Sequence, residues 1–204
     1  MQSIRQASSL ATFAALLLAA SASMSAHAAG QVVKFGMVRS PALNTVPACV
    51  PNAKGTVKIT PNGATETMNV TVSGLPANTD FDFFVIQQPN GPFGMAWYQG
   101  DIETDATGTG TAKFIGRFSN ETFIVAPGSV PAPLTQPGDA SSNPQTGPIQ
   151  TYHLGLWFNA SADAVAAGCP GAVTPFNGEH DAGVQVLNTS NFADLTGPLL
   201  KVKS

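Results

Sequence analysis

The sequence predicts an all-β fold, an antiparallel β-sandwich of one domain with one short helix and a long proline-rich loop. Short stretches in which apolar and polar residues alternate recur along the chain, and turn-forming residues separate them. Glycine and proline are frequent, whereas charged residues make up only 10% of the chain, against about 25% in an average domain. This pattern is typical of a sandwich and not of alternating strands and helices.

The N-terminus has the three parts of a signal peptide. Arg5 supplies a positive charge, residues 10–20 are apolar, and Ala26-His27-Ala28 fits the small-x-small cleavage pattern. We expect cleavage after Ala28 and a single domain over residues 29–204. The apolar run is shorter than the roughly 20 residues of a membrane span, so the mature form is predicted to have none and to be secreted or periplasmic. An uncleaved anchor is the alternative.

The two cysteines, Cys49 and Cys169, are predicted to form a disulfide, because export leads to an oxidising compartment. Their spacing fits no C-x-x-C or zinc pattern, although a metal or redox role is the alternative. Without Arg5 the chain has eight basic and twelve acidic side chains. A net charge near −4 without any basic run argues against binding to nucleic acid.

The first half of the chain supplies four predicted strands. The first, over 31–39, places Val33, Phe35 and Met37 on one face, and a loop with Cys49 follows over 40–54. A second strand over 56–60 is followed by the turn 61–63, whose Asn-Gly pair is typical of hairpins. Two further strands, around 68–73 and 81–86, flank a corner that contains glycine, proline and asparagine.

This corner carries a resemblance to a known superfamily. The stretch V-T-V-S-G-L-P-A-N-T-D-F-D-F-F-V is similar to the E–F corner of fibronectin type III and other immunoglobulin-like sandwiches. Phe81 or Phe83 stands where that corner usually has a tyrosine. The resemblance implies an immunoglobulin-like sandwich, in a superfamily of adhesion, carbohydrate-associated and structural modules. The whole chain also resembles small exported β-sandwich proteins of bacteria.

The second half continues with short strands. We expect strands over 101–105, 111–118, 123–126, 149–159, 182–187 and 199–202. The proline-rich, nearly uncharged segment 127–148 is predicted to be a long loop. A helix is predicted over 161–167, with Ser161 as its N-cap and Gly168 just past its end.

The first candidate site is an acidic row. Alternation over Asp101, Glu103 and Asp105 predicts that the three carboxylates share one strand face. Calcium prefers six to eight oxygen ligands, so this row is a candidate metal site. A solvated strand face is the alternative.

The second candidate is an aromatic surface formed by His153, Trp157, Tyr98 and Trp97. His153 and Trp157 alternate on one strand face with Gly155 between them, which predicts a shallow gap for a sugar ring or a loop. Packing of the proline-rich segment or the helix against this face is the alternative.

The third candidate is Glu179-His180-Asp181, whose residue types suit acid–base chemistry if His153 joins them. Neighbouring residues point in different directions, and no serine elbow or H-E-x-x-H motif accompanies them. The sequence therefore predicts an exported, non-catalytic binding or structural module without a cofactor, whose partner is an unknown protein or glycan. The alternatives are a metal-dependent or hydrolytic enzyme using His153, His180, Glu179 and Asp181, and a calcium-stabilised adhesion domain.

Overall fold

The computed structural model describes residues 30–118, 122–124, 148–175 and 180–203. The predicted signal peptide and the proline-rich segment up to residue 147 lie outside them. The strands of the main sheet are β1 (Val33–Arg39), β2 (Lys54–Asn62), β3 (Thr65–Ser73), β4 (Asp80–Ile86), β5 (Ala96–Glu103), β6 (Gly110–Gly116), β9 (His153–Phe158) and β12 (Gln185–Asn188).

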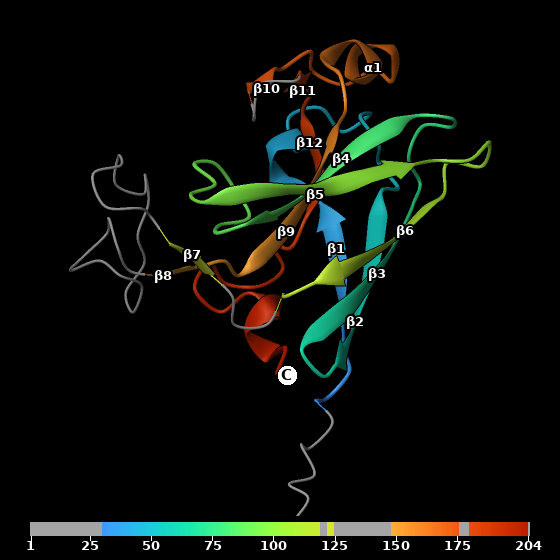
Figure 1. Cartoon of the computed structure of the whole chain (residues 1–204). Helices are drawn as coiled ribbons and strands as arrows, with labels where there is room; N and C mark the ends of the chain where they lie inside the picture. Colours follow the sequence, from blue (N-terminus) through green and yellow to red (C-terminus); the bar gives the residue numbers. More distant parts are fainter. Residues whose placement is uncertain (1–29, 119–121, 125–147, 176–179, 204) are drawn as a thin grey trace, which may run out of the picture.

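The smaller elements lie around this sheet (Figure 1). They are η1 (Pro41–Leu43), β7 (Thr122–Ile124), β8 (Pro148–Gln150), α1 (Ser161–Ala166), β10 (Thr174–Pro175), β11 (Asp181–Ala182) and η2 (Pro198–Lys201). β7 pairs with β8, and β10 pairs with β11. Figure 1 shows α1 and the β10–β11 pair together at one end of the sheet, and the C-terminus towards the other.

The prediction of an all-β protein with one short helix is confirmed. The eight main strands are antiparallel in the order β5-β4-β9-β12-β1-β2-β3-β6. The edge strands meet at the start of the β5–β6 hairpin, where Thr104 bridges to Gly110. The sheet is thus a nearly closed barrel.

The immunoglobulin-like arrangement of two separate sheets is not confirmed. β1 pairs with β2 through residues 33–37 and with β12 through Val38 and Arg39. One strand therefore joins the two halves of the structure into a single sheet. The corner over residues 74–79 does connect two strands that do not pair with each other, because β3 lies between β2 and β6 whereas β4 lies between β5 and β9.

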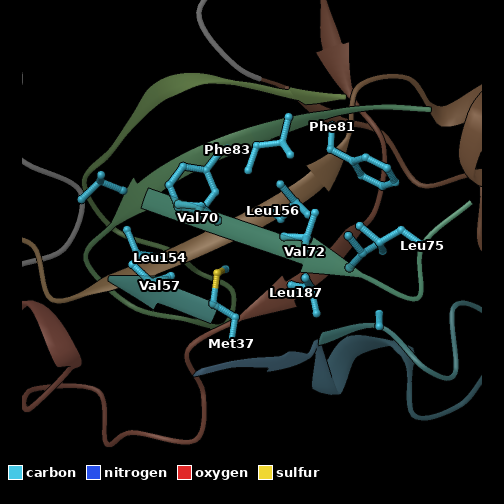
Figure 2. Packing of buried hydrophobic residues seen from close by; sticks show 14 of the residues in the cluster. Met37, Val57, Val70, Val72, Leu75, Phe81, Phe83, Leu154, Leu156 and Leu187 are labelled. Atoms are coloured by element: carbon cyan, nitrogen blue, oxygen red, sulfur yellow. The ribbon is translucent and has the colours of Figure 1, made fainter. Parts of the chain in front are cut away.

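The core lies inside the barrel, where alternate residues of each strand point (Figure 2). Val70 and Val72 of β3 face Phe81 and Phe83 of β4, and all four are buried. Further core side chains come from the other strands: Met37, Val57, Leu154, Leu156 and Leu187. The face predicted for the first strand, formed by Val33, Phe35 and Met37, is the face of β1 that contributes to this core.

A glycine lies where the two edge strands approach each other. Gly100 of β5 has φ 144°, and a β-carbon there would lie 2.9 Å from the ring of Phe114 on β6. That ring stacks on Phe83, with centroids 5.4 Å apart. A side chain at residue 100 would therefore crowd the ring of Phe114 and would be strained at this φ.

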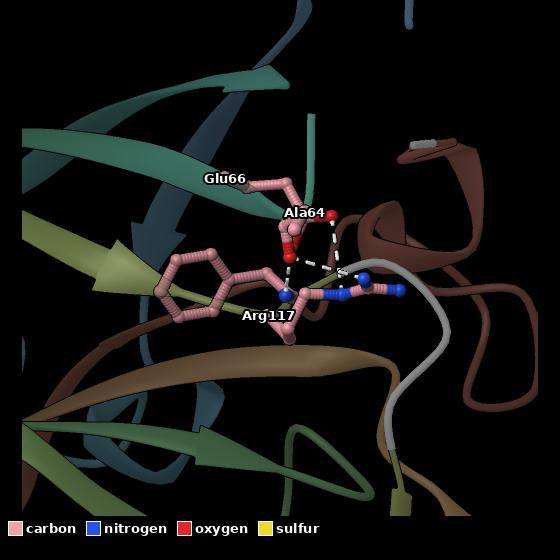
Figure 3. A network of polar contacts seen from close by, with 4 residues as sticks. Ala64, Glu66 and Arg117 are labelled. Carbon is pink, nitrogen blue, oxygen red and sulfur yellow. Dashed lines mark hydrogen bonds and ion pairs between the residues drawn. The ribbon is translucent and has the colours of Figure 1, made fainter. Parts of the chain in front are cut away.

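A buried ion pair fastens the far end of the β3–β6 seam (Figure 3). Glu66 is fully buried, accepts a hydrogen bond from the backbone N–H of Phe118 and lies 3.7 Å from the Nε of Arg117. Arg117 also donates to the carbonyl of Ala64, at 3.1 Å. The chain after β6 is thus tied to the β2–β3 hairpin.

The disulfide between Cys49 and Cys169 is confirmed. It connects the loop before β2 with the residue that follows the end of α1. Gly168 has φ 73°, as expected just past a helix end. The predicted Ser161 cap is wrong by one residue, because the N-cap is the extended Ala160, which provides no side-chain hydrogen bond.

Two predicted strands differ from the structure. Residues 149–159 split into β8, which pairs with β7, and β9, which pairs with β4 and β12. The predicted strand over 199–202 is instead the helical turn η2, in which Leu199 and Val202 are both buried. Pro198 favours a helical start, and a spacing of three places both side chains on one face. Within the described residues, no helix has the length and apolar character needed to cross a membrane.

Candidate ligand-binding groove on the outer face of the sheet

A second apolar cluster covers the outside of the barrel over β4 and β9. Phe81, Phe83 and Val85 point into the core, so the alternate residues of β4 point outwards. These outward side chains are buried as well, because the loop between β4 and β5 and the β11 region cover them. The cluster consists of Phe84, Ile86, Trp157 and Ala182, with Phe93 and Tyr98 packed against it.

A β-bulge brings Tyr98 into this cluster. Phe83 is opposite Gly100 while Phe84 is opposite Tyr98, so Gln99 is an extra residue in β5. Because of it, Tyr98 and Asp101 point to the same outer face although they are three residues apart. The hydroxyl of Tyr98 donates a hydrogen bond to Asp101.

Four aromatic rings form a continuous array. Ring centroids lie 5.7 Å apart for Phe84 and Tyr98, 5.2 Å for Phe84 and Trp157, and 5.1 Å for Phe93 and Trp157. These distances are within the favourable range for aromatic pairs. The rings come from β4, β5, β9 and the loop over residues 87–95, so the array forms only in the folded chain.

Three rings of the array, those of Phe84, Phe93 and Trp157, line an apolar groove of about 430 Å³. Its lining residues are Phe84, Ile86, Pro92, Phe93, Gly94, Ala96, Trp157, Thr174 and Pro175. A second hollow of about 500 Å³ adjoins it and shares Phe93, Trp157 and Thr174. Small-molecule sites are commonly concave, mostly apolar and of roughly 300–1,000 Å³.

The loop that forms one wall of the groove is held firmly. Gln87 and Met95 exchange two hydrogen bonds, at 2.8 and 3.1 Å. The carbonyl of Pro89 accepts hydrogen bonds from Gln185 and Asn188 of β12, at 3.1 and 2.8 Å. The groove is therefore largely pre-formed.

His153, predicted as a binding residue, has a structural role. It is fully buried, with its Nδ1 2.8 Å from the hydroxyl of Thr189 and its Nε2 3.0 Å from the carbonyl of Asp194. A carbonyl only accepts, so Nε2 carries the proton and Nδ1 accepts from Thr189. Burial lowers the pKa of His153, which favours the neutral ring.

Gly155 does separate His153 from Trp157, but the predicted gap is filled. A β-carbon on Gly155 would lie 2.3 Å from the indole of Trp157. Trp157 thus lies over the glycine, is only 3% exposed, and cannot offer a face for a sugar to stack on. Its edge instead contributes to the groove.

Trp97 and Tyr98 do not form one surface, because neighbouring residues in a strand point to opposite faces. Trp97 packs against the main core, and its indole N–H donates to Gln99 at 3.0 Å. Of the four predicted aromatic and histidine residues, only Trp157 and Tyr98 therefore belong to the outer cluster.

Of the predicted acidic row, Asp101 and Glu103 share a strand face, whereas Asp105 does not belong to the strand. Asp101 and Glu103 lie on the outer face of β5, where they are opposite Asp82 and Asp80 of β4. Asp105 lies past the strand end and caps the hairpin turn. It accepts hydrogen bonds from the backbone N–H of Thr107 and Thr109 and from the hydroxyl of Thr107, which lower its pKa. Among the described residues, no three His, Cys, Asp or Glu side chains are grouped to hold a metal ion.

Sequence reasoning missed Asp82. Its side chain is fully buried, and within the described part of the chain neither carboxylate oxygen has a hydrogen bond. The Nε2 of His180 lies 3.5 Å from Oδ1. Burial raises the pKa of Asp82 to about 6, an effect that His180 partly offsets and Asp101 reinforces. An acidic residue within the apolar run Phe81–Val85 was the available signal.

The two histidines of the alternative acid–base group do not come together. His180 lies beside Asp82, whereas His153 is opposite Ile86, four residues further along β4. That separation is about 13 Å at roughly 3.3 Å per residue, too far for a shared site. Asp181 is exposed in β11, and Glu179 lies outside the described residues.

Searches of protein-family models, of curated proteins and of solved structures found no match for this chain. The fold and the site define a class only: an all-β protein with a nearly closed sheet, a long-range disulfide and an apolar groove on the outside of the barrel.

Proposed function

We propose that this chain is an exported, non-catalytic binding module, and that its binding site is the outer groove formed by β4, β9, β10 and the loop over residues 87–95. The observation that carries the proposal is the groove itself. It is concave, pre-formed and lined by three rings of the aromatic array. A concave apolar surface that stays open to solvent commonly marks an interaction site, because an apolar group of a ligand can be buried there.

The disulfide supports the exported location, since such bonds persist in oxidising compartments. The signal-like N-terminus gives independent support from the sequence. The immunoglobulin-like relationship stays a prediction, supported by the corner between β3 and β4.

An enzyme using His153 and His180 is less well supported. His153 has both ring nitrogens engaged, and the two histidines lie towards different ends of β4. A calcium-stabilised domain using Asp101, Glu103 and Asp105 is also less well supported, because Asp105 is engaged in its own turn.

The test is a fluorescence titration of the mature protein with N-phenylnaphthylamine, a neutral apolar probe. We expect saturable binding that Ala96→Phe abolishes, because Ala96 lines the groove and is exposed on an edge strand. Ile115→Phe is the matched control, since Ile115 is an exposed residue on the other edge strand, β6. Equal binding by the two variants, or no binding by the unmodified protein, would overturn the proposal.

A further inference from the structure

The charged side chains are segregated between the two halves of the barrel. The chain has no lysine or arginine over residues 59–112 or 118–200. Strands β4, β5, β9 and β12 therefore carry no lysine or arginine, while β1, β2 and β6 carry Lys34, Arg39, Lys54, Lys58 and Lys113. The half of the sheet that bears the groove is thus entirely without permanent positive charge.

Carboxylates face one another on this same half. Across β4 and β5, Asp82 is directly opposite Asp101, and Asp80 is directly opposite Glu103. Like charges in directly opposed positions destabilise a sheet. Such an arrangement lowers the free energy of a cation placed nearby, and the low-dielectric surroundings of a buried group strengthen that effect.

Of these four carboxylates, that of Asp82 is the one whose surroundings suggest a ligand. It is fully buried beside the aromatic array, directly opposite Trp157 on β9, and shares the outer face of β4 with Phe84. Among the described residues neither of its oxygens has a hydrogen bond, and the Nε2 of His180 lies 3.5 Å from Oδ1. A buried carboxylate without hydrogen bonds is costly to the free protein, and an approaching cation would reduce that cost.

The aromatic rings suit a cation as well as an apolar body. An ammonium or guanidinium within about 6 Å of a ring centroid is attracted to the ring face. Tyr98 donates a hydrogen bond to Asp101, Trp157 is opposite Asp82, and Phe84 and Ile86 follow Asp82 on the outer face of β4. The surface thus changes from acidic to apolar along the strands.

We propose that the groove selects a small organic cation, an ammonium compound with an aromatic or alkyl body. The body lies in the groove on Phe93, Ile86 and Trp157, and the positive group lies at the end next to Asp82 and Asp101. This inference rests on the proposed binding function and adds the charge of its ligand. Glycan or protein partners without such a group would not meet this preference.

The experiment is calorimetric titration with three ligands of similar shape: phenethylammonium, phenethyl alcohol and hydrocinnamate. The titration is made at about pH 7.5, above the pKa of about 6 to which burial raises Asp82. We expect the ammonium compound to bind about tenfold more tightly than the alcohol, and the carboxylate most weakly. Asp82→Asn should bring the affinity for the ammonium compound close to that for the alcohol while leaving the alcohol unchanged.

Asp105→Asn is the matched control, because it removes one negative charge from the exposed turn while keeping an oxygen for Thr107 and Thr109. It should alter none of the three affinities. If the alcohol binds as tightly as the ammonium compound, the cation preference is overturned and the groove remains a binding site. If none of the three binds, and N-phenylnaphthylamine does not bind either, both proposals are overturned.

Discussion

The carboxylate of Asp82 lies 3.5 Å from the Nε2 of His180, and among the described residues neither of its oxygens has a hydrogen bond. Asp82 is fully buried, whereas 39% of the His180 side chain is exposed. Asp82 thus lies buried between Phe81 and Phe83 of β4 without the hydrogen bonds that normally accompany burial. Its burial costs stability whenever the carboxyl group is ionised.

Asp82→Asn should stabilise the free protein at neutral pH. The pKa of Asp82 is raised from 3.8 to about 6 by burial, with Asp101 and Asp80 raising it further and His180 lowering it. The folded form therefore holds its proton more strongly, and stability falls as pH rises from about 4 to 6, by roughly 2–3 kcal/mol. Urea unfolding should show the variant more stable at about pH 7.5 and equal to the parent near pH 4. Equal stability at both pH values would contradict this account of Asp82.

Removing the disulfide should cost much of the stability. The Cys49–Cys169 bond closes a loop of 120 residues, and the chain-entropy model assigns such a link about 4–5 kcal/mol. We expect the double variant Cys49→Ser, Cys169→Ser to lose about 3–5 kcal/mol of unfolding free energy. The parent protein measured in reductant should match it. A loss below about 1 kcal/mol would show that the bond constrains little.

Gly155→Ala should displace Trp157. The added methyl would lie 2.3 Å from the indole. The indole cannot easily move away, because the rings of Phe84 and Phe93 pack against it in T-shaped contacts. We expect a loss of about 1–3 kcal/mol and a shift of the tryptophan emission to longer wavelength. In a Trp157→Phe background the same change should cost less, which a double-mutant cycle measures. Additive effects would mean that the ring does not depend on the glycine.

Glu66→Ala should weaken the β3–β6 seam. The substitution removes the acceptor for the N–H of Phe118 and the partner of Arg117, a loss of about 2–4 kcal/mol for a buried group. Glu103→Ala is the control, because Glu103 is exposed on β5 opposite another acid. Thermal unfolding should move strongly for the first and hardly for the second. A similar effect of both would show that the burial of Glu66 is unimportant.

The inward face of the barrel was predictable because it depends on local alternation. Val33, Val57, Val70 and Leu154 alternate with polar or small residues, and one buried face is enough to fix that pattern. The disulfide followed from the expected compartment and from the presence of two cysteines only.

The site was harder to predict because it depends on non-local pairing. The extra residue Gln99 shifts the alternation in β5, so spacing alone could not place Tyr98 beside Asp101. The opposition of Asp82 and Asp101 requires the β4–β5 register. The single sheet likewise depends on β1 pairing on both sides, a feature that no local pattern encodes.

The most direct test of the binding function is an NMR titration of the mature protein with phenethyl alcohol, in which the two indole N–H signals are followed. Trp157 borders the groove, whereas Trp97 packs against the main core and donates to Gln99. We predict that the Trp157 signal shifts with saturation, together with the amides of Phe84 and Phe93, while the Trp97 signal stays in place. An unmoved Trp157 signal, or changes confined to another surface, would contradict the groove as the binding site.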